Sequence, residues 1–363
     1  MKRGKLRIKF FAAFVMAFLY IVFFPAASGK ELFLVRDWAA DLEPSGFVQP
    51  RSYSSGEIRF FRLSDRLGYI DEQGSILFQE DVAYDAAMEE DFFVNYSALP
   101  FNLVMRGRRG EFLANIDGSG YPFTRGGKLF LVSPGGYALS RVDADGRILW
   151  EREFPAMITA TDAGNESVVI GLLDGGVIVL GDGGNTEYEL SVEREGLPVT
   201  LQTGIAADGL YFAAVAGGRP QRLMLFARED LSYSPVFVAE LPGSYRRAIV
   251  ARYYSAPDYF VFEQPGGAGV LQSDRQRLFY VRLPGELLAL ADERPGGLFL
   301  ALSAADDATH ASAFMPNGST AFNFSYEDSS SGETRFSHFL RAGKDDFLLG
   351  TGTRLYRVRL EVM

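Results

Sequence analysis

The amino-acid sequence predicts an all-β protein, a β-propeller built from four-stranded blades. Three observations predict it: two repeat patterns of similar period run through the chain, tight-turn dipeptides separate the apolar runs, and helical periodicity is nearly absent after the N-terminal segment. Repeated four-stranded units of about 40 to 45 residues are typical of propellers, whose closed ring leaves only short, protected strand edges.

The first repeat is an acidic or glycine-containing turn followed by two or three bulky apolar residues, as in Glu90-Asp91-Phe92-Phe93-Val94. Seven copies occur at intervals of 37 to 49 residues. Their central apolar residues are Phe93, Phe130, Val169, Tyr211, Phe260, Phe299 and Phe347. Each copy predicts a buried strand that begins just after a turn.

The second repeat is a strand, a tight turn and another strand, as in 141–150 about Gly146. Seven copies again occur, 36 to 47 residues apart and interleaved with the first repeat. Their turns are centred on Gly74, Gly110, Gly146, Gly183, Asp230, Arg275 and Gly318. Asp-Gly and Gly-Gly steps supply the positive φ angles that tight hairpins need. The two repeats together predict a four-stranded unit with a buried strand pair and an outer hairpin.

The number of repeats favours seven blades, the last one completed by strands from the N-terminal side of the chain. Strands predicted at 58–61, 67–70 and 76–78 precede the first copy of the first repeat, and the chain ends with strands predicted at 347–349 and 355–360. If these end segments formed two incomplete blades, the ring would have eight. Two tandem β-sandwiches are the rival architecture, disfavoured because no linker rich in Pro, Ser or charge separates two halves.

The N-terminal segment has the pattern of an export signal. Five Lys and Arg residues and no acid lie within 1–9, and an apolar run over 10–24 leads to Pro25-Ala26-Ala27-Ser28-Gly29. We expect 1–28 to be a signal peptide cut near Ser28 or, since 10–27 is just long enough to span a bilayer, an uncleaved helical anchor. A buried core helix of a cytosolic protein is disfavoured, because the run is apolar on every side.

The expected organisation is therefore a signal or anchor at 1–28, an N-terminal extension at 29–56 and a propeller domain at 57–363. A short turn of helix is expected at 36–43. The positive flank of the signal stays in the cytoplasm, so the domain is exported and we expect it in the periplasm or elsewhere in the cell envelope.

Composition excludes several classes of site and partner. The chain has no Cys, which excludes thiolate zinc sites, iron–sulfur clusters, disulfides, a cysteine nucleophile and a lipid-modified Cys. Its formal net charge is −10 and would be −15 without 1–28, which carries five positive and no negative side chains. Such a charge disfavours nucleic acid and general adsorption to anionic lipid.

One stretch, 137–184, carries a recognisable arrangement. Gly146-Arg147-Ile148-Leu149-Trp150 is a Gly-x-x-x-Trp strand, and 168–180 follow as an apolar strand, an Asp-Gly turn and an apolar strand. This arrangement resembles the repeat of quinoprotein-like (PQQ-like or WD40-like) propellers. Only Trp150 fills the tryptophan position. The residues expected to replace the tryptophan in other units are Phe78, Phe112, Tyr188, Phe279 and Phe322.

The resemblance also has implications for activity. Enzymatic members of that family hold a quinone cofactor and calcium, commonly with an adjacent Cys pair, and this sequence has no Cys and no recognisable cofactor set. The resemblance thus implies the non-enzymatic branch, exported propellers that act as scaffolds and include outer-membrane assembly lipoproteins. The chain departs from those lipoproteins in lacking the Cys that would carry the lipid.

We expect no catalytic, cofactor-binding or metal site. His310 and His338 are the only histidines, and there is no Gly-x-Ser-x-Gly elbow for a nucleophile. Asp143-Ala144-Asp145-Gly146 begins like a calcium loop but lacks the remaining ligands, so a hairpin turn is expected. Three carboxylate pairs in predicted turns are expected to be solvated: Glu89-Glu90, Asp306-Asp307 and Asp345-Asp346.

One local patch is a candidate partner-binding surface because exposed Tyr and Arg side chains are common at protein interfaces. It comprises Tyr245, Arg246, Arg247, Arg252, Tyr253 and Tyr254. A solvated hairpin end is the simpler interpretation of its arginines and of a second cluster at Arg106, Arg108 and Arg109.

The leading functional hypothesis is an exported or anchored propeller that needs no cofactor, is not an enzyme, and binds other envelope proteins through its loop faces. It would touch a membrane only through an uncleaved N-terminal segment. The alternative is a hydrolase or lyase that acts on a glycan or peptide in the central channel, and a sensor ectodomain is a weaker third hypothesis. Converging carboxylates in a cleft would favour the enzyme, whereas an apolar patch on a loop face would favour the scaffold.

Overall fold

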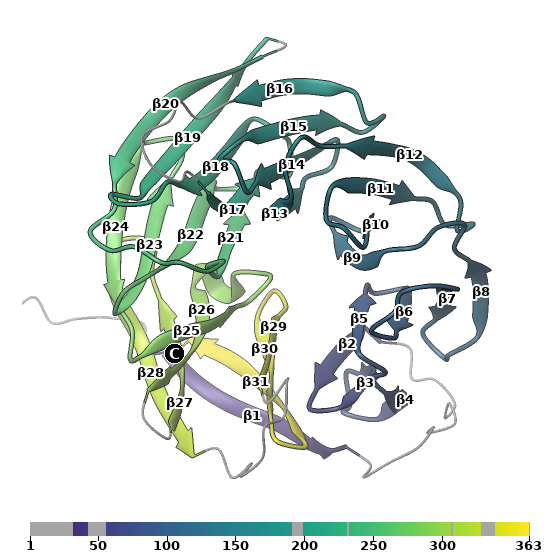
Figure 1. Ribbon diagram of the computed structural model, residues 1–363. Helices are drawn as coiled ribbons and strands as arrows, with labels where there is room; N and C mark the ends of the chain where they lie inside the picture. Colours follow the sequence, from purple (N-terminus) through teal and green to yellow (C-terminus); the bar gives the residue numbers. More distant parts are fainter. Residues whose placement is uncertain are drawn as a thin grey trace, which may run out of the picture. The chain divides into compact units, whose positions relative to one another are not determined.

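The computed structural model describes residues 32–42, 56–190, 199–230, 232–305, 308–327 and 338–362. In these residues the chain forms eight β-sheets, seven of four strands and one of three, and a single 3-10 turn at Pro295–Gly297. Residues 36–359 make up one compact unit, and 32–35 and 360–362 belong to a second one. The propeller described below is that of 36–359 (Figure 1).

We number the sheets as blades in chain order. Blade 1 is β2 (Ile58–Leu63), β3 (Arg66–Asp71) and β4 (Ile76–Asp81). Blade 2 is β5 (Asp85–Met88), β6 (Phe92–Tyr96), β7 (Val104–Gly107) and β8 (Phe112–Asn115). Blade 3 is β9 (Tyr121–Arg125), β10 (Lys128–Val132), β11 (Ala138–Val142) and β12 (Ile148–Glu153). Blade 4 is β13 (Ile158–Ala163), β14 (Ser167–Leu172), β15 (Val177–Gly181) and β16 (Thr186–Leu190).

The remaining blades follow the same plan. Blade 5 is β17 (Thr200–Ile205), β18 (Tyr211–Ala216), β19 (Arg222–Glu229) and β20 (Ser232–Glu240). Blade 6 is β21 (Ala251–Tyr254), β22 (Tyr259–Gln264), β23 (Gly267–Gln272) and β24 (Arg277–Arg282). Blade 7 is β25 (Glu286–Leu290), β26 (Phe299–Ala305), β27 (Ala308–Phe314) and β28 (Thr320–Glu327). Blade 8 is β29 (His338–Ala342), β30 (Asp346–Thr351), β31 (Arg354–Val362) and β1 (Leu32–Asp41).

Blades 1 to 7 are antiparallel meanders, and in blade 8 the three strands β29, β30 and β31 continue the same plan before β1 joins them. The first strand lies nearest the centre of the ring in the four-stranded blades (Figure 1). Antiparallel pairing sends alternate turns to opposite faces. We call the face with the turns between strands one and two, and between strands three and four, the hairpin face. The opposite face, which carries the turns between strands two and three and the connections between blades, is the loop face.

The predicted fold is confirmed, but the preference for seven blades was wrong and the alternative of eight is correct. The first sequence repeat marks the second strands of blades 2 to 8, from Phe93 in β6 to Phe347 in β30. The second repeat marks the outer hairpins of blades 1 to 7, from Gly74 to Gly318. Each repeat therefore counts seven, and each misses a different end of the ring.

The hydrophobic core lies between neighbouring blades rather than within one sheet. One cluster joins Leu225 of blade 5 to Phe260 of blade 6, and another joins Phe78 of blade 1 to Phe93 of blade 2, with ring centroids 5.4 Å apart. Because bulky side chains fill each wedge, a blade is stable only against its neighbours.

Both tryptophans anchor the outer edge of one blade on the next. Trp150 in β12 donates its indole N–H to the carbonyl of Asp182, 2.8 Å away in blade 4. Trp38 in β1 donates to the carbonyl of Glu72, also at 2.8 Å, in blade 1. The tryptophan position therefore occurs twice, and the sequence interpretation recognised only Trp150.

A glycine with positive φ lies under each of these rings. Gly184 (φ 79°) and Gly74 (φ 83°) lie in the outer hairpins beneath the two indoles. A Cβ atom would lie 2.7 Å from the indole at the first position and 2.6 Å at the second, so only glycine fits. Phe78 covers Gly110 in the same way, as expected for a residue replacing the tryptophan.

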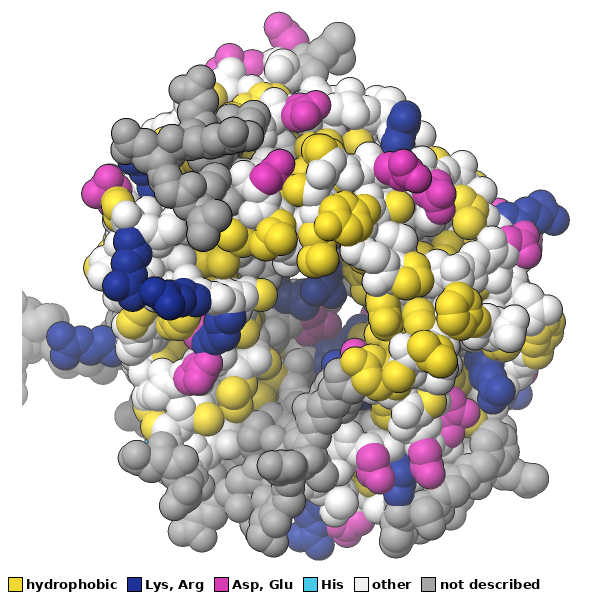
Figure 2. Space-filling view, in the orientation of Figure 1, with side chains coloured by type: hydrophobic (Ala, Val, Ile, Leu, Met, Phe, Trp, Pro, Cys, Tyr) yellow, Lys and Arg dark blue, Asp and Glu magenta, His cyan; other side chains and the backbone are white. Residues whose placement is uncertain are grey.

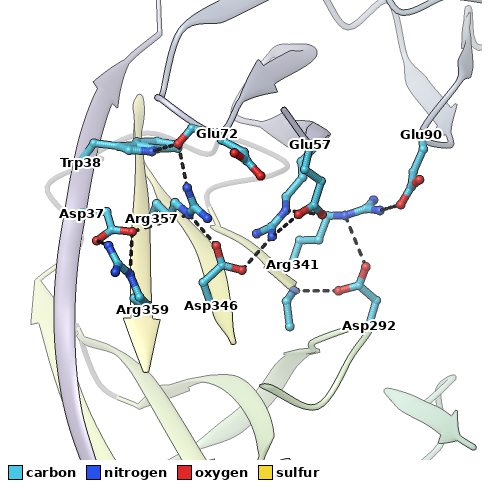
Figure 3. Close-up of polar contacts among 12 residues, drawn as sticks. Asp37, Trp38, Glu57, Glu72, Glu90, Asp292, Arg341, Asp346, Arg357 and Arg359 are labelled. Carbon is cyan, nitrogen blue, oxygen red and sulfur yellow. Dashed lines mark hydrogen bonds and ion pairs between the residues drawn. The ribbon is translucent and has the colours of Figure 1, made fainter. Parts of the chain in front are cut away.

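The ring closes where two distant parts of the chain share blade 8 (Figure 3). β1 pairs with β31, so an N-terminal strand becomes the outermost strand of the last blade. Arg359 forms an ion pair with Asp37, and Arg354 forms one with Asp41, across more than 300 positions of sequence. Along 36–41, β1 therefore covers the edge of β31, which would otherwise be left unpaired.

Blade 8 is joined to blade 1 by a buried ion network around Asp346 (Figure 3). The Asp346 carboxylate accepts hydrogen bonds from Arg59 Nη2 at 2.7 Å and from Arg357 Nε at 2.5 Å. Arg357 Nη1 also donates to the carbonyl of Glu72 at 2.8 Å, and Arg59 forms a second ion pair with Glu57 at 2.9 Å. Asp346 is the buried carboxylate that both arginines share, and Arg357 also lies 3.7 Å from Asp37.

The position of β1 differs from what the sequence predicted for the N-terminal region. The turn of helix expected at 36–43 was wrong over 36–41, which belong to β1, because pairing with β31 overrides local preference. β1 also lies inside 29–56, the segment expected to precede the propeller. The signal or anchor at 1–28 lies outside the described residues, and in the described ones no helix is long and apolar enough to cross a membrane.

We predict that Asp346→Asn lowers the free energy of unfolding by about 3 kcal/mol, because two largely buried guanidinium groups lose their shared carboxylate. Asp345→Asn is the matched control, since its side chain is exposed, and should change stability by less than about 0.5 kcal/mol. Urea unfolding followed by tryptophan fluorescence measures both. Equal stabilities of the two variants would contradict the role given to Asp346.

Candidate functional site

The central channel contains two connected cavities, one of about 530 Å³ and one of about 430 Å³. The larger is lined by turns of the hairpin face, including those that hold Ser255 and Arg294, and the smaller mainly by innermost strands. Arg125, Arg252 and Asp292 line both cavities and mark the waist between them. Basic and acidic side chains are visible inside the central opening in Figure 2.

Most charged groups along the channel are paired. Arg62 forms an ion pair with Asp85, and Arg341 lies 3.4 Å from Asp292 and 3.3 Å from Glu90 (Figure 3). Arg341 also lies over a phenyl ring, and Arg294 over two aromatic rings. The innermost strands thus form a polar wall in which most carboxylates are compensated.

Arg125 and Asp162 face each other at the waist, with Nε and Oδ1 3.7 Å apart. Enclosure by the channel wall raises the pKa of Asp162, against the opposing effect of Arg125, although Asp162 Oδ2 accepts the Ile205 N–H at 3.0 Å. Enclosure lowers the pKa of Arg125, and the charge of Arg252 adds to this effect. For both Asp162 and Arg125, the loss of contact with water therefore disfavours the charged form.

The six residues predicted as one exposed patch do not form one. Tyr253 and Tyr254 are buried, and their hydroxyl groups pair with Ser273 Oγ at 2.6 Å and the carbonyl of Ala291 at 2.7 Å. They lie on the innermost strand β21, where Tyr253 packs in the wedge with blade 5 and Tyr254 in the wedge with blade 7. Arg252, which precedes them, lines the channel. An exposed surface at Tyr253 and Tyr254 is thus contradicted by the structure.

The other members of that predicted patch lie on the connection between blades 5 and 6, on the loop face. Arg247 makes two hydrogen bonds to Glu263, at 2.9 and 2.7 Å, and its guanidinium lies 4.8 Å from the ring centre of Tyr245. Glu263 is only 1% exposed, and its charge raises the pKa of Arg247 further. Arg246 is exposed and makes no contact of this kind with the described residues. Arg247 is thus a structural residue.

The loop face carries an arc of exposed apolar side chains that the sequence interpretation missed. Its members lie in turns and connections of blades 2 to 4 and are 40% to 71% exposed. They are Leu99, Phe101, Tyr137, Met157 and Leu173. Figure 2 shows hydrophobic side chains gathered on one side of the central opening, over these blades.

Backbone and side-chain contacts link neighbouring members at each end of this apolar arc. The Leu173 N–H donates to the carbonyl of Met157 at 2.8 Å, and the Met157 side chain lies against Gly136, next to Tyr137. At the other end, the N–H of Gly120, between blades 2 and 3, donates to the carbonyl of Pro100, which separates Leu99 from Phe101. Contiguous exposed apolar surface of this kind marks interaction sites on soluble proteins.

The remaining sequence candidates are dispersed. His310 lies on β27, the third strand of blade 7, and in the described residues no three His, Cys, Asp or Glu side chains gather as a metal site would require. Asp143 accepts the N–H groups of Asp145 and Arg147 within its turn, as a hairpin requires. Asp306-Asp307 and the side chain of His338 lie outside what the structure describes.

Comparison with known families agrees with this architecture. A family model described as beta-propeller protein matches residues 1–362. The chain belongs to this β-propeller protein family. An uncharacterised protein of Treponema pallidum (strain Nichols) is 26% identical over 290 residues, which cover 78% of this β-propeller and 76% of the relative.

Two solved structures share the fold at low sequence identity. BamB from Moraxella catarrhalis has a TM-score of 0.59 and 13% identity, over 90% of this β-propeller and 100% of the BamB chain. The computationally designed protein Ika8 has a TM-score of 0.61 and 15% identity, over 92% and 100% of the two chains. Both similarities establish the architecture, and neither assigns an activity.

We predict that Arg247→Ala lowers the free energy of unfolding by about 2 kcal/mol, because it leaves Glu263 buried without its cation while part of the pair is open to solvent. Arg246→Ala is the matched control on the adjacent residue and should leave stability within about 0.5 kcal/mol. Chemical denaturation of the two variants measures this, and an Arg247→Ala protein as stable as the control would contradict the assignment.

Asp258 lies in the turn between β21 and β22, and we predict that its carboxyl group makes the free energy of unfolding depend on pH. Burial, together with the charges of Asp208 and Asp274, raises the pKa of Asp258 to about 6 from an ordinary value of 3.8. The folded state therefore holds this proton more tightly than the unfolded chain, and its stabilising effect is lost as the pH rises from about 4 to about 6.

Asp258→Asn should remove that loss and stabilise the protein at pH 7.5 by about 1 kcal/mol, after allowance for solvent screening, with no gain at pH 4. Thermal unfolding at both pH values tests this. The exposed residue Asp145, replaced by Asn, serves as control, and a gain of equal size at both pH values would rule out titration of Asp258 as the cause.

Proposed function

We propose that the protein is an exported, non-catalytic scaffold of the cell envelope that binds a hydrophobic segment of another envelope protein on its loop face. The observation that carries this proposal is the apolar arc from Leu99 to Leu173, whose five large side chains are exposed to solvent on four neighbouring connections. Exposure of such a surface does not stabilise a monomer, so it indicates a binding partner. Interfaces are centred on such clusters, with polar residues at their rim.

The location in the envelope is supported by the sequence of 1–28, with its basic residues and apolar run. The structural similarity to BamB supports the propeller fold of this proposal and nothing finer. The quinoprotein-like subtype suggested by the strand ending in Trp150 remains a prediction.

The contacts of two channel carboxylates, Asp162 and Asp292, favour the scaffold over a channel enzyme; a third, Glu293, also lines the larger cavity. Asp162 accepts a backbone N–H at 3.0 Å, and Asp292 accepts the Ala342 N–H at 2.8 Å and lies beside Arg341. These contacts hold the two carboxylates against the wall, whereas a general acid or base must reach a substrate. The apolar arc has no counterpart in the hydrolase or lyase hypothesis.

We predict that the double variant Phe101→Asp and Leu173→Asp loses at least tenfold of its crosslinking to the partner, because one large apolar contact at each end of the arc is replaced by charge. The measurement is chemical crosslinking of the tagged, full-length protein in its own cells, followed by mass spectrometry of the captured proteins and of the N-terminus.

A matched control carries the same replacements outside the arc. Phe112→Asp on β8 and Leu210→Asp on the hairpin face change side chains that are 63% and 49% exposed. This control should retain the partner. Loss of the partner in both double variants, or retention in both at unchanged thermal stability, would show that the apolar arc is not the binding surface.

A further inference from the structure

The waist of the central channel holds an arginine that has no direct partner among the described side chains, although Asp162, Asp292 and Glu293 line the same cavity. Asp162 is the carboxylate within ion-pair distance of Arg125, at 3.7 Å, and Asp292 is engaged by Arg341. Arg252 lines both cavities and makes no ion pair or hydrogen bond with any residue in the described parts of the chain. Its guanidinium therefore makes no direct contact with a carboxylate in these residues, and its charge acts on Asp162 without an ion pair.

The two waist arginines repel each other. Arg125 and Arg252 come from blades 3 and 6 and face the same cavities from different sides of the ring. Two like charges held in a partly enclosed space raise the free energy of the folded protein. An anion that binds between the two arginines lowers this electrostatic free energy. A local cluster of cations can therefore bind an anion even in a protein whose net charge is negative.

The surroundings offer further donors to such an anion. Ser255 Oγ accepts the Ala207 N–H at 2.8 Å, which leaves its own hydroxyl proton free to point into the larger cavity. Arg294 lines the same cavity, with its guanidinium held by a hydrogen bond of 2.7 Å to the carbonyl of Gly297 and by the rings of Tyr259 and Phe299. Its charge is fixed in place and has no carboxylate partner among the described residues.

We infer that the channel waist is a binding site for a small molecule that carries a carboxylate or phosphate group. The oxyanion would lie between the guanidinium groups of Arg125 and Arg252, whose paired N–H groups match two oxygens of such a group. The rest of the ligand would occupy the larger cavity, whose volume of about 530 Å³ is in the range of small-molecule sites. This site is independent of the apolar arc.

The test compares sodium phosphate and sodium succinate with sodium chloride at equal ionic strength and pH 7.5. Isothermal titration calorimetry gives affinity, and thermal unfolding gives the shift in Tm, expected to be about 2 °C at ten times Kd. Arg252→Gln and Arg125→Gln should each weaken binding at least tenfold, and Arg252→Lys should restore part of it. Arg246→Gln, on the loop face and outside the channel, should bind like the wild type.

A purely structural role for Arg252 would give a different result. If the site is built for an anion, Arg252→Gln keeps or raises Tm without ligand while it abolishes the anion-dependent shift, because it removes a repulsive charge. Binding of only one of the two anions supports the site and assigns its ligand class. The inference is overturned if neither anion raises Tm more than chloride does, or if both Gln variants bind as the wild type does.

Discussion

The pairing of β1 with β31 is the contact on which the rest of the structure depends. Each wedge of core is shared between two blades, so a ring with one open joint would leave the apolar faces of two blades uncovered. β1 closes that joint: it covers the edge of β31, and its Trp38 ring seals the outer hairpin of blade 1 over Gly74. The channel and the loop face acquire their geometry only once this joint is made.

Much of this fold could be predicted from the sequence because its signals are local. A turn with glycine at positive φ, followed by apolar residues, recurs in each blade and needs no knowledge of distant contacts. Ring closure could not be predicted in this way. Among the described residues β1 pairs only with β31, which lies more than 300 residues away in sequence. The blade count failed for the same reason, and Trp38 was assigned to a helical turn.

The candidate sites could be predicted far less well than the fold. The patch around Tyr245 to Tyr254 is continuous in sequence, but β21 begins inside it and takes Tyr253 and Tyr254 into the core. The channel arginines are one residue each on separate blades, so only the ring brings them together. The apolar arc did carry a signal: Leu99-Pro100-Phe101 and Gly135-Gly136-Tyr137 place large apolar residues inside turns, where solvent exposure is expected.

The ring geometry also explains why the two candidate surfaces differ in chemistry. Innermost strands of a propeller face one another across a channel too wide for their side chains to pack, so this wall must be polar or charged to hold water. Paired arginines and carboxylates satisfy that requirement, and an unpaired Arg252 exceeds it. The loop face has no such constraint, because its turns are free of the core and can carry apolar side chains without loss of fold. The ring itself requires neither an arginine without a direct partner in the channel nor large apolar side chains exposed on the turns. Because neither helps to build the ring, both are best explained by something that the protein binds.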